Sequence, residues 1–313
     1  MLAGARRGIS IHDFLSVSVK VVIATMRRLP PTWNRETARP PSTARLSTKH
    51  HRGRRRVVSA AIATQLLVSL LAWNAVVPCS ASPNSPATSR PATTPLTAEQ
   101  ASVAEGYGDA VRVTELLRQN LWNKYQHADS ESDRSAIMAQ ARDTIVHVIA
   151  SQLLPAWLGT PWSFYGASEQ PGVGAIACGY FVTTVLRDAG FRVERIRLAQ
   201  QASELIIRSL VRAENIKRWS NVSIETFVDQ VHHWGPGLYV VGLDNHVGFL
   251  LDDGDEVVFI HSSYREPSQV IKEHAGGSSI LAGSRYRVVG KLTADERLIR
   301  RWLAGEAIST VRH

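Results

Sequence analysis

Two short apolar segments joined by an acidic turn constrain the fold of this 313-residue chain more than any other feature. Residues 245–251 and 256–261 have strand character, and residues 252–255 between them contain the Asp-Gly pair typical of a hairpin turn. Both faces of the two strands are apolar, with Val247, Phe249 and Leu251 on one and Leu250, Val257 and Phe259 on the other. Because such strands are covered on both sides, the hairpin predicts a layered α/β or α+β domain.

The turn also sets the register of two histidines. If Asp253-Gly254 is a two-residue turn, Asp252 faces Asp255, and counting outward along the strands places His246 opposite His261. Directly paired residues have Cβ atoms about 4.5–5.5 Å apart, so one imidazole can orient the other through a hydrogen bond. A four-residue loop preserves this arrangement, whereas a three-residue loop with a bulge turns one histidine to the opposite face.

A cysteine precedes the clearest helical pattern in the chain. Apolar residues of helical period follow Cys178 and stop at Gly190, a common residue just past a helix end. The unpaired N–H groups and the dipole of a helix N-terminus favour thiolate over thiol. The position therefore predicts an activated nucleophile, and a small buried hydrophobic side chain is the alternative.

The order cysteine, histidine, histidine resembles the NlpC-type cell-wall cysteine peptidases. The segment 159–166, which reads GTPWSFYG, is similar to that family's G-x-P-Y-x-x-G motif, and the resemblance spans residues 159–263. It implies an α+β, papain-like fold in which an antiparallel sheet packs against the cysteine helix. It also implies that Cys178 is the nucleophile, that His246 is the general base, and that His261 holds the base in its working tautomer.

The chain departs from this family beside the cysteine. Ala177 and Gly179 stand where the family usually has Asp and Ser, residues implicated in holding substrate. Trp162 replaces a tyrosine that helps to stabilise the oxyanion, and its indole donates only through the ring N–H. Tyr165 is an alternative donor, as is the backbone N–H of Cys178. Trp162, Tyr165 and Gly179 are therefore the substrate or oxyanion candidates.

The expected reaction is hydrolysis of an amide through an acyl-enzyme thioester without a cofactor. The resemblance, together with the predicted export described below, implies a peptidoglycan stem or crosslink as the substrate. Acyl transfer through the same thioester and a non-catalytic binding module on the same fold remain open. So does a zinc site formed by Cys178, His246 and His261, although the short ligand spacings of zinc motifs are missing. If His246 has no catalytic or metal-binding role, the alternative is that it is a hydrogen-bonded histidine of the core.

The net charge of +9 suggests a nucleic-acid partner, but its distribution argues against one. Residues 1–56 hold 13 basic and 2 acidic residues, so the remaining chain holds 23 basic and 25 acidic residues. A nearly neutral body without a basic stripe predicts no nucleic-acid binding.

The basic N-terminus leads into an export signal. Arg54-Arg55-Arg56 precede the apolar core 57–77, and the small residues Cys79-Ser80-Ala81 resemble a cleavage site. Residues 1–81 are therefore predicted to be a basic extension followed by a signal peptide or membrane anchor, which contacts the membrane during export to the periplasm or the exterior. A lipoprotein modified at Cys79 is a further alternative.

Residues 82–96 are rich in Pro, Ser, Thr and Ala and are predicted to be a disordered linker. Residues 97–313 form one predicted catalytic domain. It comprises a helical lead-in at 97–158 that ends at Pro155, an NlpC-like core at 159–290 with strands at 238–243 and 286–290, and a terminal helix at 293–303. A helical insertion at 199–231 is expected to wall the active-site cleft.

Overall fold

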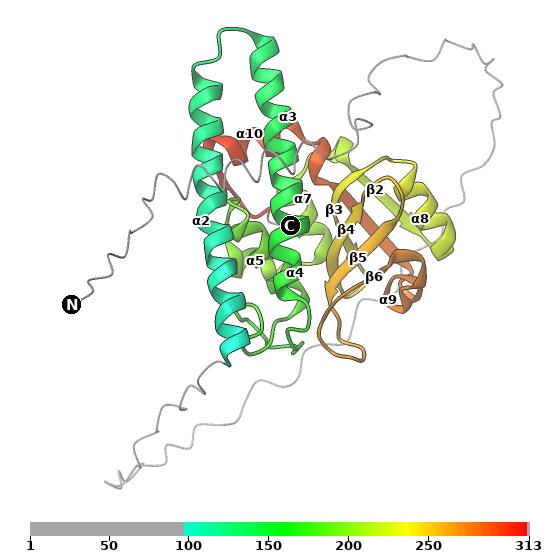
Figure 1. The fold of residues 1–313 in the computed structure, drawn as a ribbon. Helices are drawn as coiled ribbons and strands as arrows, with labels where there is room; N and C mark the ends of the chain where they lie inside the picture. The colour runs from blue at the N-terminus through cyan, green and yellow to red at the C-terminus, as the bar shows by residue number, and fades with distance from the viewer. Residues whose placement is uncertain (1–96, 312–313) are drawn as a thin grey trace, which may run out of the picture. The chain divides into compact units, whose positions relative to one another are not determined.

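The computed structural model describes residues 97–311, which form an α+β unit of helices and a six-stranded antiparallel sheet (Figure 1). The predicted signal or anchor at 1–81 and the predicted linker at 82–96 lie outside the described residues. Within the described range, no helix has the length and apolar character needed to cross a membrane.

The longer helices are α2 (Ala98–Gln126), α3 (Glu131–Val148), α5 (Cys178–Asp188), α7 (Ser203–Leu210), α8 (Ile224–His232) and α10 (Glu296–Ala304). Shorter helices are α4 (Leu154–Trp157), α6 (Arg195–Ala199) and α9 (Ser279–Gly283). The sheet contains β2 (Ile216–Ser220), β3 (Gly237–Leu243), β4 (Val247–Asp252), β5 (Val257–Ser262), β6 (Val270–His274) and β7 (Tyr286–Lys291). Two further strands, β1 (Arg192–Val193) and β8 (Ala307–Ile308), pair in parallel.

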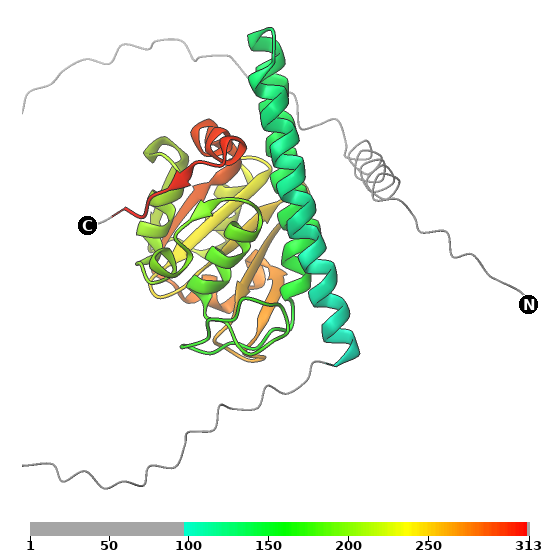
Figure 2. The ribbon, with the colours of Figure 1, turned by 90° about the vertical axis from the view of Figure 1, so that its left-hand side faces the viewer.

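The lead-in is a long hairpin of α2 and α3, as predicted, and it lies along one side of the molecule (Figure 2). Thr97 and Gln100 form the expected capping box at the start of α2. The prediction that Pro155 ends the helix is wrong. A π-helical turn at Ile149–Leu153 follows α3, and the helix then continues as α4. Pro155 then lies in the first turn of α4, where a missing N–H costs little.

The strands lie in the order β2-β7-β3-β4-β5-β6, and the sheet is covered on both faces, as predicted. Phe249 and Ile260 join the core that contains α5 and the helical hairpin. Leu250 and Phe259 join a second core that contains Phe227 of α8 and residues of α9. The central hairpin therefore carries one core on each side, with α5 on one and α8 on the other.

The insertion at 199–231 contains the two predicted helices, α7 and α8, and Ser223 caps α8 by accepting from the backbone N–H of Thr226. It also contains the edge strand β2, which the sequence prediction missed. Two adjacent charged residues, Lys217 and Arg218, interrupt the apolar pattern of β2. The strand forms because Ile216 and Trp219 bury on opposite faces of the sheet.

Candidate active site

The hairpin turn differs from the two-residue turn that was predicted. Asp252 pairs with Val257, so residues 253–256 form a four-residue loop. The Asp253 carboxylate accepts from the backbone N–H groups of Asp255 and Glu256, and Gly254 adopts a left-handed φ of 98°. The register is shifted by two residues from the prediction, and an even shift leaves every side chain on its predicted face.

As a result, His246 and His261 share a face but are not directly opposite, and the predicted direct pairing is wrong. Extending the β4–β5 register places Gly248 opposite His261. The ring of His246 reaches His261 along the diagonal, and His246 Nε2 lies 2.9 Å from His261 Nδ1. The two rings are perpendicular. The predicted contact between the imidazoles is therefore present.

The contact is possible because Gly248 has no side chain. A Cβ atom at this position would lie 2.8 Å from His261 Cβ and 2.6 Å from Phe259 Cε2, closer than real Cβ atoms approach. The His261 ring instead stacks on Phe259, with ring centroids 4.0 Å apart. Gly248 and Phe259 thus fix where the imidazole of His261 lies.

A fourth residue, Glu273 of β6, continues this chain of contacts. Its Oε1 lies 3.1 Å from His261 Nε2, and the hydrogen bond to His261 holds the pKa of the Glu273 carboxyl below its usual range. The sequence prediction did not include Glu273 because it did not include β6. The signal available was the short run Val270–His274, in which two apolar residues are followed by three polar ones.

Glu273 determines which ring nitrogens carry protons. A carboxylate only accepts hydrogen bonds, so His261 Nε2 must be the donor and His261 Nδ1 the acceptor. His246 Nε2 must then donate to His261 Nδ1, which leaves His246 Nδ1 without a proton. His246 Nδ1 is buried and has no hydrogen-bond partner in the described part of the chain. The network therefore presents one basic, unpaired nitrogen.

Hydrogen bonds from the sheet and the preceding loop hold the nucleophile candidate. Cys178 is the first residue of α5, and the backbone of Ala177 donates to Gly166 O. Ser262, next to His261 on β5, donates from its hydroxyl to Ile176 O at 2.7 Å. The strand that carries His261 is thus tied to the segment that leads into Cys178.

Cys178 and His246 line one cavity of about 240 Å³. Residues of the 199–231 insertion form the opposite wall, as predicted, and they are Ala199, Gln201, Ala202, Ser203 and Ile206. Within residues 97–311, no hydrogen bond joins Cys178 Sγ to His246. Both residues line this cavity, with the thiol half-buried and the imidazole buried, and the His246 ring packs against Phe259 and Tyr264.

Burial dominates the electrostatics of both groups. Desolvation raises the pKa of the Cys178 thiol, although the backbone N–H groups of Val247, Gly179 and Cys178 itself favour the thiolate. Desolvation and the neighbouring His261 lower the pKa of His246 to about 3. The predicted activation by the helix end alone is thus not borne out, because the resting pair is a neutral thiol and a neutral imidazole.

The N-terminus of α5 offers backbone donors to the cavity. Ala177 at the N-cap makes no side-chain hydrogen bond, so no cap occupies the first N–H groups of the helix. A Cβ atom on Gly179 would lie 2.3 Å from Ala199 O, so the serine of the resembled family does not fit here. Gly179 lines the cavity through its backbone alone.

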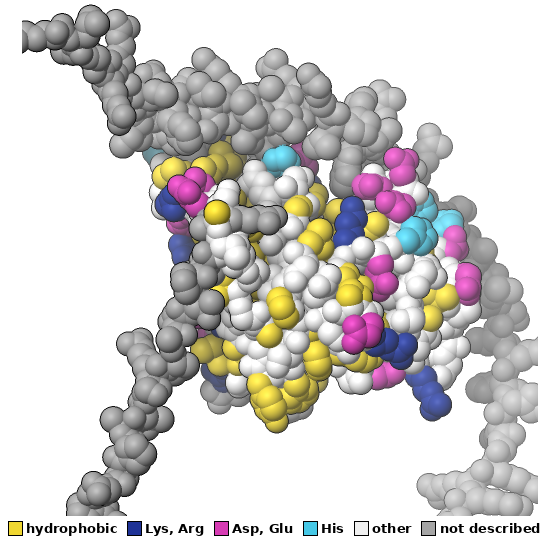
Figure 3. Space-filling model, turned by 60° about the horizontal axis from the view of Figure 1, so that its bottom comes forward, with side chains coloured by type: hydrophobic (Ala, Val, Ile, Leu, Met, Phe, Trp, Pro, Cys, Tyr) yellow, Lys and Arg dark blue, Asp and Glu magenta, His cyan; other side chains and the backbone are white. Residues whose placement is uncertain are grey.

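The two aromatic candidates do not line this cavity. Trp162 is half-buried, and Tyr165 is 88% exposed and packs edge-on against Phe164. This loop lies at the end of the molecule where apolar side chains gather on the surface (Figure 3). Tyr264, absent from the sequence prediction, lies between Trp162 and His246, with its ring centroid 5.4 Å from that of His246. It is the aromatic side chain closest to the proposed base among these.

The zinc alternative finds no support in the geometry of residues 97–311. They contain no group of three or more His, Cys, Asp or Glu side chains arranged to hold a metal ion. His246 Nε2 and His261 Nδ1 hydrogen-bond to each other, so these two nitrogens are not free to bind a metal. Comparison with protein-family models, with curated proteins and with solved structures found no match to this chain.

Proposed function

We propose that this protein is an exported cysteine hydrolase of the NlpC-like, papain-like type that cleaves an amide bond in a cell-wall peptide. The observation that carries the proposal is the hydrogen-bonded network from Glu273 through His261 to His246, in which both imidazoles are buried. It leaves His246 Nδ1 without a hydrogen-bond partner in the described part of the chain, and His246 and Cys178 line the same cavity. Burying two imidazoles is costly unless they are hydrogen-bonded, and the network supplies these bonds at every ring nitrogen except His246 Nδ1.

In the proposed reaction, Cys178 Sγ attacks the carbonyl carbon while His246 Nδ1 takes the thiol proton. The imidazolium then gives that proton to the nitrogen of the leaving amine as the C–N bond breaks. This leaves a thioester on Cys178. Water attacks the thioester, loses its proton to His246 Nδ1, and the free acid leaves as the proton returns to the sulfur.

In this scheme the network supports the charged imidazole only while negative charge develops on sulfur, because burial and His261 disfavour that charge at rest. A neutral imidazole with a pKa of about 3 is a weak base until negative charge develops on sulfur beside it. As His246 gains a proton, the hydrogen bond from its Nε2–H to His261 Nδ1 strengthens. The hydrogen bond from His261 Nε2–H to the Glu273 carboxylate then strengthens as well. The N–H groups of Cys178 and Gly179 are the oxyanion donors in this scheme.

The choice of a cell-wall peptide as substrate rests on the resemblance of residues 159–263 and on the predicted export signal. Purified peptidoglycan and its soluble stem peptides are therefore the substrates to test, with new amino groups and new free acids as the products counted. Hydrolysis releases one of each per bond cleaved. Acyl transfer to an added amine consumes that amine and yields a new amide instead.

Wild-type protein is expected to release both products, and Cys178→Ala is expected to release neither. A wild-type protein that leaves all wall fragments intact, yet still acylates Cys178 with an activated ester, would refute the substrate class and retain the nucleophile. Failure of both reactions would refute the proposal as a whole.

A further inference from the structure

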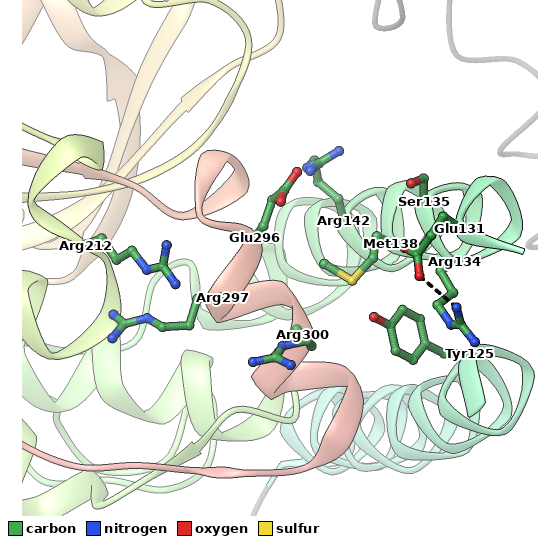
Figure 4. Close-up of a pocket in the computed structure, with 10 residues that line it drawn as sticks. All are labelled: Tyr125, Glu131, Arg134, Ser135, Met138, Arg142, Arg212, Glu296, Arg297 and Arg300. Carbon is green, nitrogen blue, oxygen red and sulfur yellow. Dashed lines mark hydrogen bonds and ion pairs between the residues drawn. The ribbon is translucent and has the colours of Figure 1, made fainter. Parts of the chain in front are cut away.

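A second, larger pocket lies between the helical hairpin and α10, and it is rich in arginine (Figure 4). Its volume is about 390 Å³. The residues that line it are Tyr125, Glu131, Arg134, Ser135, Met138, Arg142, Arg212, Glu296, Arg297 and Arg300. Five arginines against two glutamates give the lining a net charge of +3.

This arginine pocket is remote from the cysteine cavity. Trp302 of α10 donates to Ala189 O at the C-terminal end of α5, whereas Cys178 begins that helix. The 11 residues of α5 span about 16 Å at the usual helical rise. The pocket and the cavity also have no lining residue in common.

Most of the positive charge in the arginine pocket has no carboxylate partner within the lining. Among these ten residues, the one ion pair is that of Arg134 with Glu131. Arg142 uses its Nε to donate to Thr293 O, and the Arg300 side chain makes no hydrogen bond or ion pair within residues 97–311. Arg212 contacts Glu214 at 3.7 Å, outside the pocket.

Arg297 shows most directly that the arginines of this pocket lack hydrogen-bond and ion-pair partners. Its Nε is buried without a hydrogen-bond partner in the described part of the chain, and its nearest carboxylate, Asp295, is 4.0 Å away. The Asp295 carboxylate already accepts other hydrogen bonds, among them one from the backbone N–H of Leu298 as the cap of α10 and one from the backbone N–H of Arg212. Figure 4 shows Arg212, Arg297 and Arg300 on one side of the pocket.

We propose that the arginine pocket binds a phosphate-bearing anion. Guanidinium groups present paired N–H donors that match phosphate oxygens, and they are preferred where planar, bidentate recognition of phosphate matters. A phosphate monoester brings close to two negative charges and three strong acceptor oxygens, whereas a phosphodiester such as phosphatidylglycerol brings one charge and two free oxygens. Both offer paired oxygens to the guanidinium groups of three neighbouring arginines. The anion would supply the partner that Arg297 Nε lacks.

The test uses the full chain and two sources of the same chemistry. Pyrophosphate binding is measured by isothermal titration calorimetry, and vesicle binding is measured by flotation with phosphatidylglycerol and with phosphatidylcholine. The variant Arg297→Gln/Arg300→Gln removes two charges from the pocket. Arg112→Gln/Arg285→Gln removes two charges from exposed positions elsewhere and is the matched control.

Pyrophosphate is expected to bind with one-to-one stoichiometry, about ten-fold more weakly to the pocket variant and unchanged in the control. If only phosphatidylglycerol vesicles retain the protein, and the pocket variant loses that preference over phosphatidylcholine, the phosphate is that of a lipid headgroup. Binding to neither source, or equal losses in the two double variants, overturns the proposal. If the double variant does not fold, Arg300→Gln alone, which changes an exposed side chain, is measured instead and is expected to weaken pyrophosphate binding.

Discussion

Adding one methyl group at Gly248 is expected to disable the histidine network without touching any of its polar atoms. In Gly248→Ala, the new Cβ would lie 2.6 Å from Phe259 Cε2, 2.8 Å from His261 Cβ and 3.0 Å from Ile260 O. Phe259 and His261 are both fully buried, so neither can move into solvent. The stacked pair must shift together, which displaces His261 from His246.

The magnitude follows from two opposing effects. Overpacking a dense core costs about 1–3 kcal/mol, whereas Gly→Ala at an ordinary φ gains about 0.4–1 kcal/mol through the unfolded state. We expect Gly248→Ala to lose about 1–2 kcal/mol of unfolding free energy in urea. Gly277→Ala is the matched control, because nothing lies within 4 Å of its Cβ position, and it should be neutral or slightly stabilising.

The same two variants test the function. Acylation of Cys178 by p-nitrophenyl acetate should slow in Gly248→Ala and stay unchanged in Gly277→Ala. A Gly248→Ala protein as stable and as reactive as its control would refute the role assigned to the close packing of Gly248 and His261.

Three further predictions concern neighbouring groups. Gly179→Ala places a Cβ 2.3 Å from Ala199 O, a backbone atom, so the net loss of unfolding free energy in urea should exceed about 1 kcal/mol despite the better helix propensity; unchanged stability would refute the tight contact. The pKa of His246 falls from 6.5 in the unfolded chain to about 3 in the folded one, so its contribution is fully present above pH 6.5 and is lost as pH falls toward 3. Stability should fall by roughly 2 kcal/mol between pH 6.5 and 5 through this group, and His246→Asn should flatten the decline; parallel curves would contradict the buried neutral ring. Glu273→Gln keeps an acceptor for His261 but removes the charge, so the acylation rate should drop by about ten-fold or more while the urea midpoint changes little; an equal rate would remove Glu273 from the network.

The β4–β5 hairpin shows which features of the structure could be predicted from the sequence. Apolar residues on both faces predicted a sheet covered on both sides, and the two cores confirm it. The predicted turn was one residue too early, because the four-residue loop spans 253–256, where the Asp253 carboxylate accepts from two backbone N–H groups. The shared face of His246 and His261 was still correct, since a shift of two residues preserves the alternation of a strand.

Glu273 marks what the sequence could not predict. It lies on the edge strand β6, whose five residues carry too little alternation to be recognised alone. Its partner His261 is 12 residues away in the chain, and only the pairing of β5 with β6 brings them together. The thiol pKa was mispredicted for a related reason, because helix position was visible in the sequence and burial was not.

The most direct test of the central claim is the pre-steady-state burst of p-nitrophenol from p-nitrophenyl acetate, with mass spectrometry to locate the acetyl group. We expect one equivalent of burst and one acetyl group on Cys178 in the wild-type chain, no burst in Cys178→Ala, and a burst slowed by about 10²–10⁴-fold in His246→Ala, the usual contribution of a general base. A burst rate that is the same with and without His246 would contradict the account, because the unpaired Nδ1 would then play no part in activating the thiol.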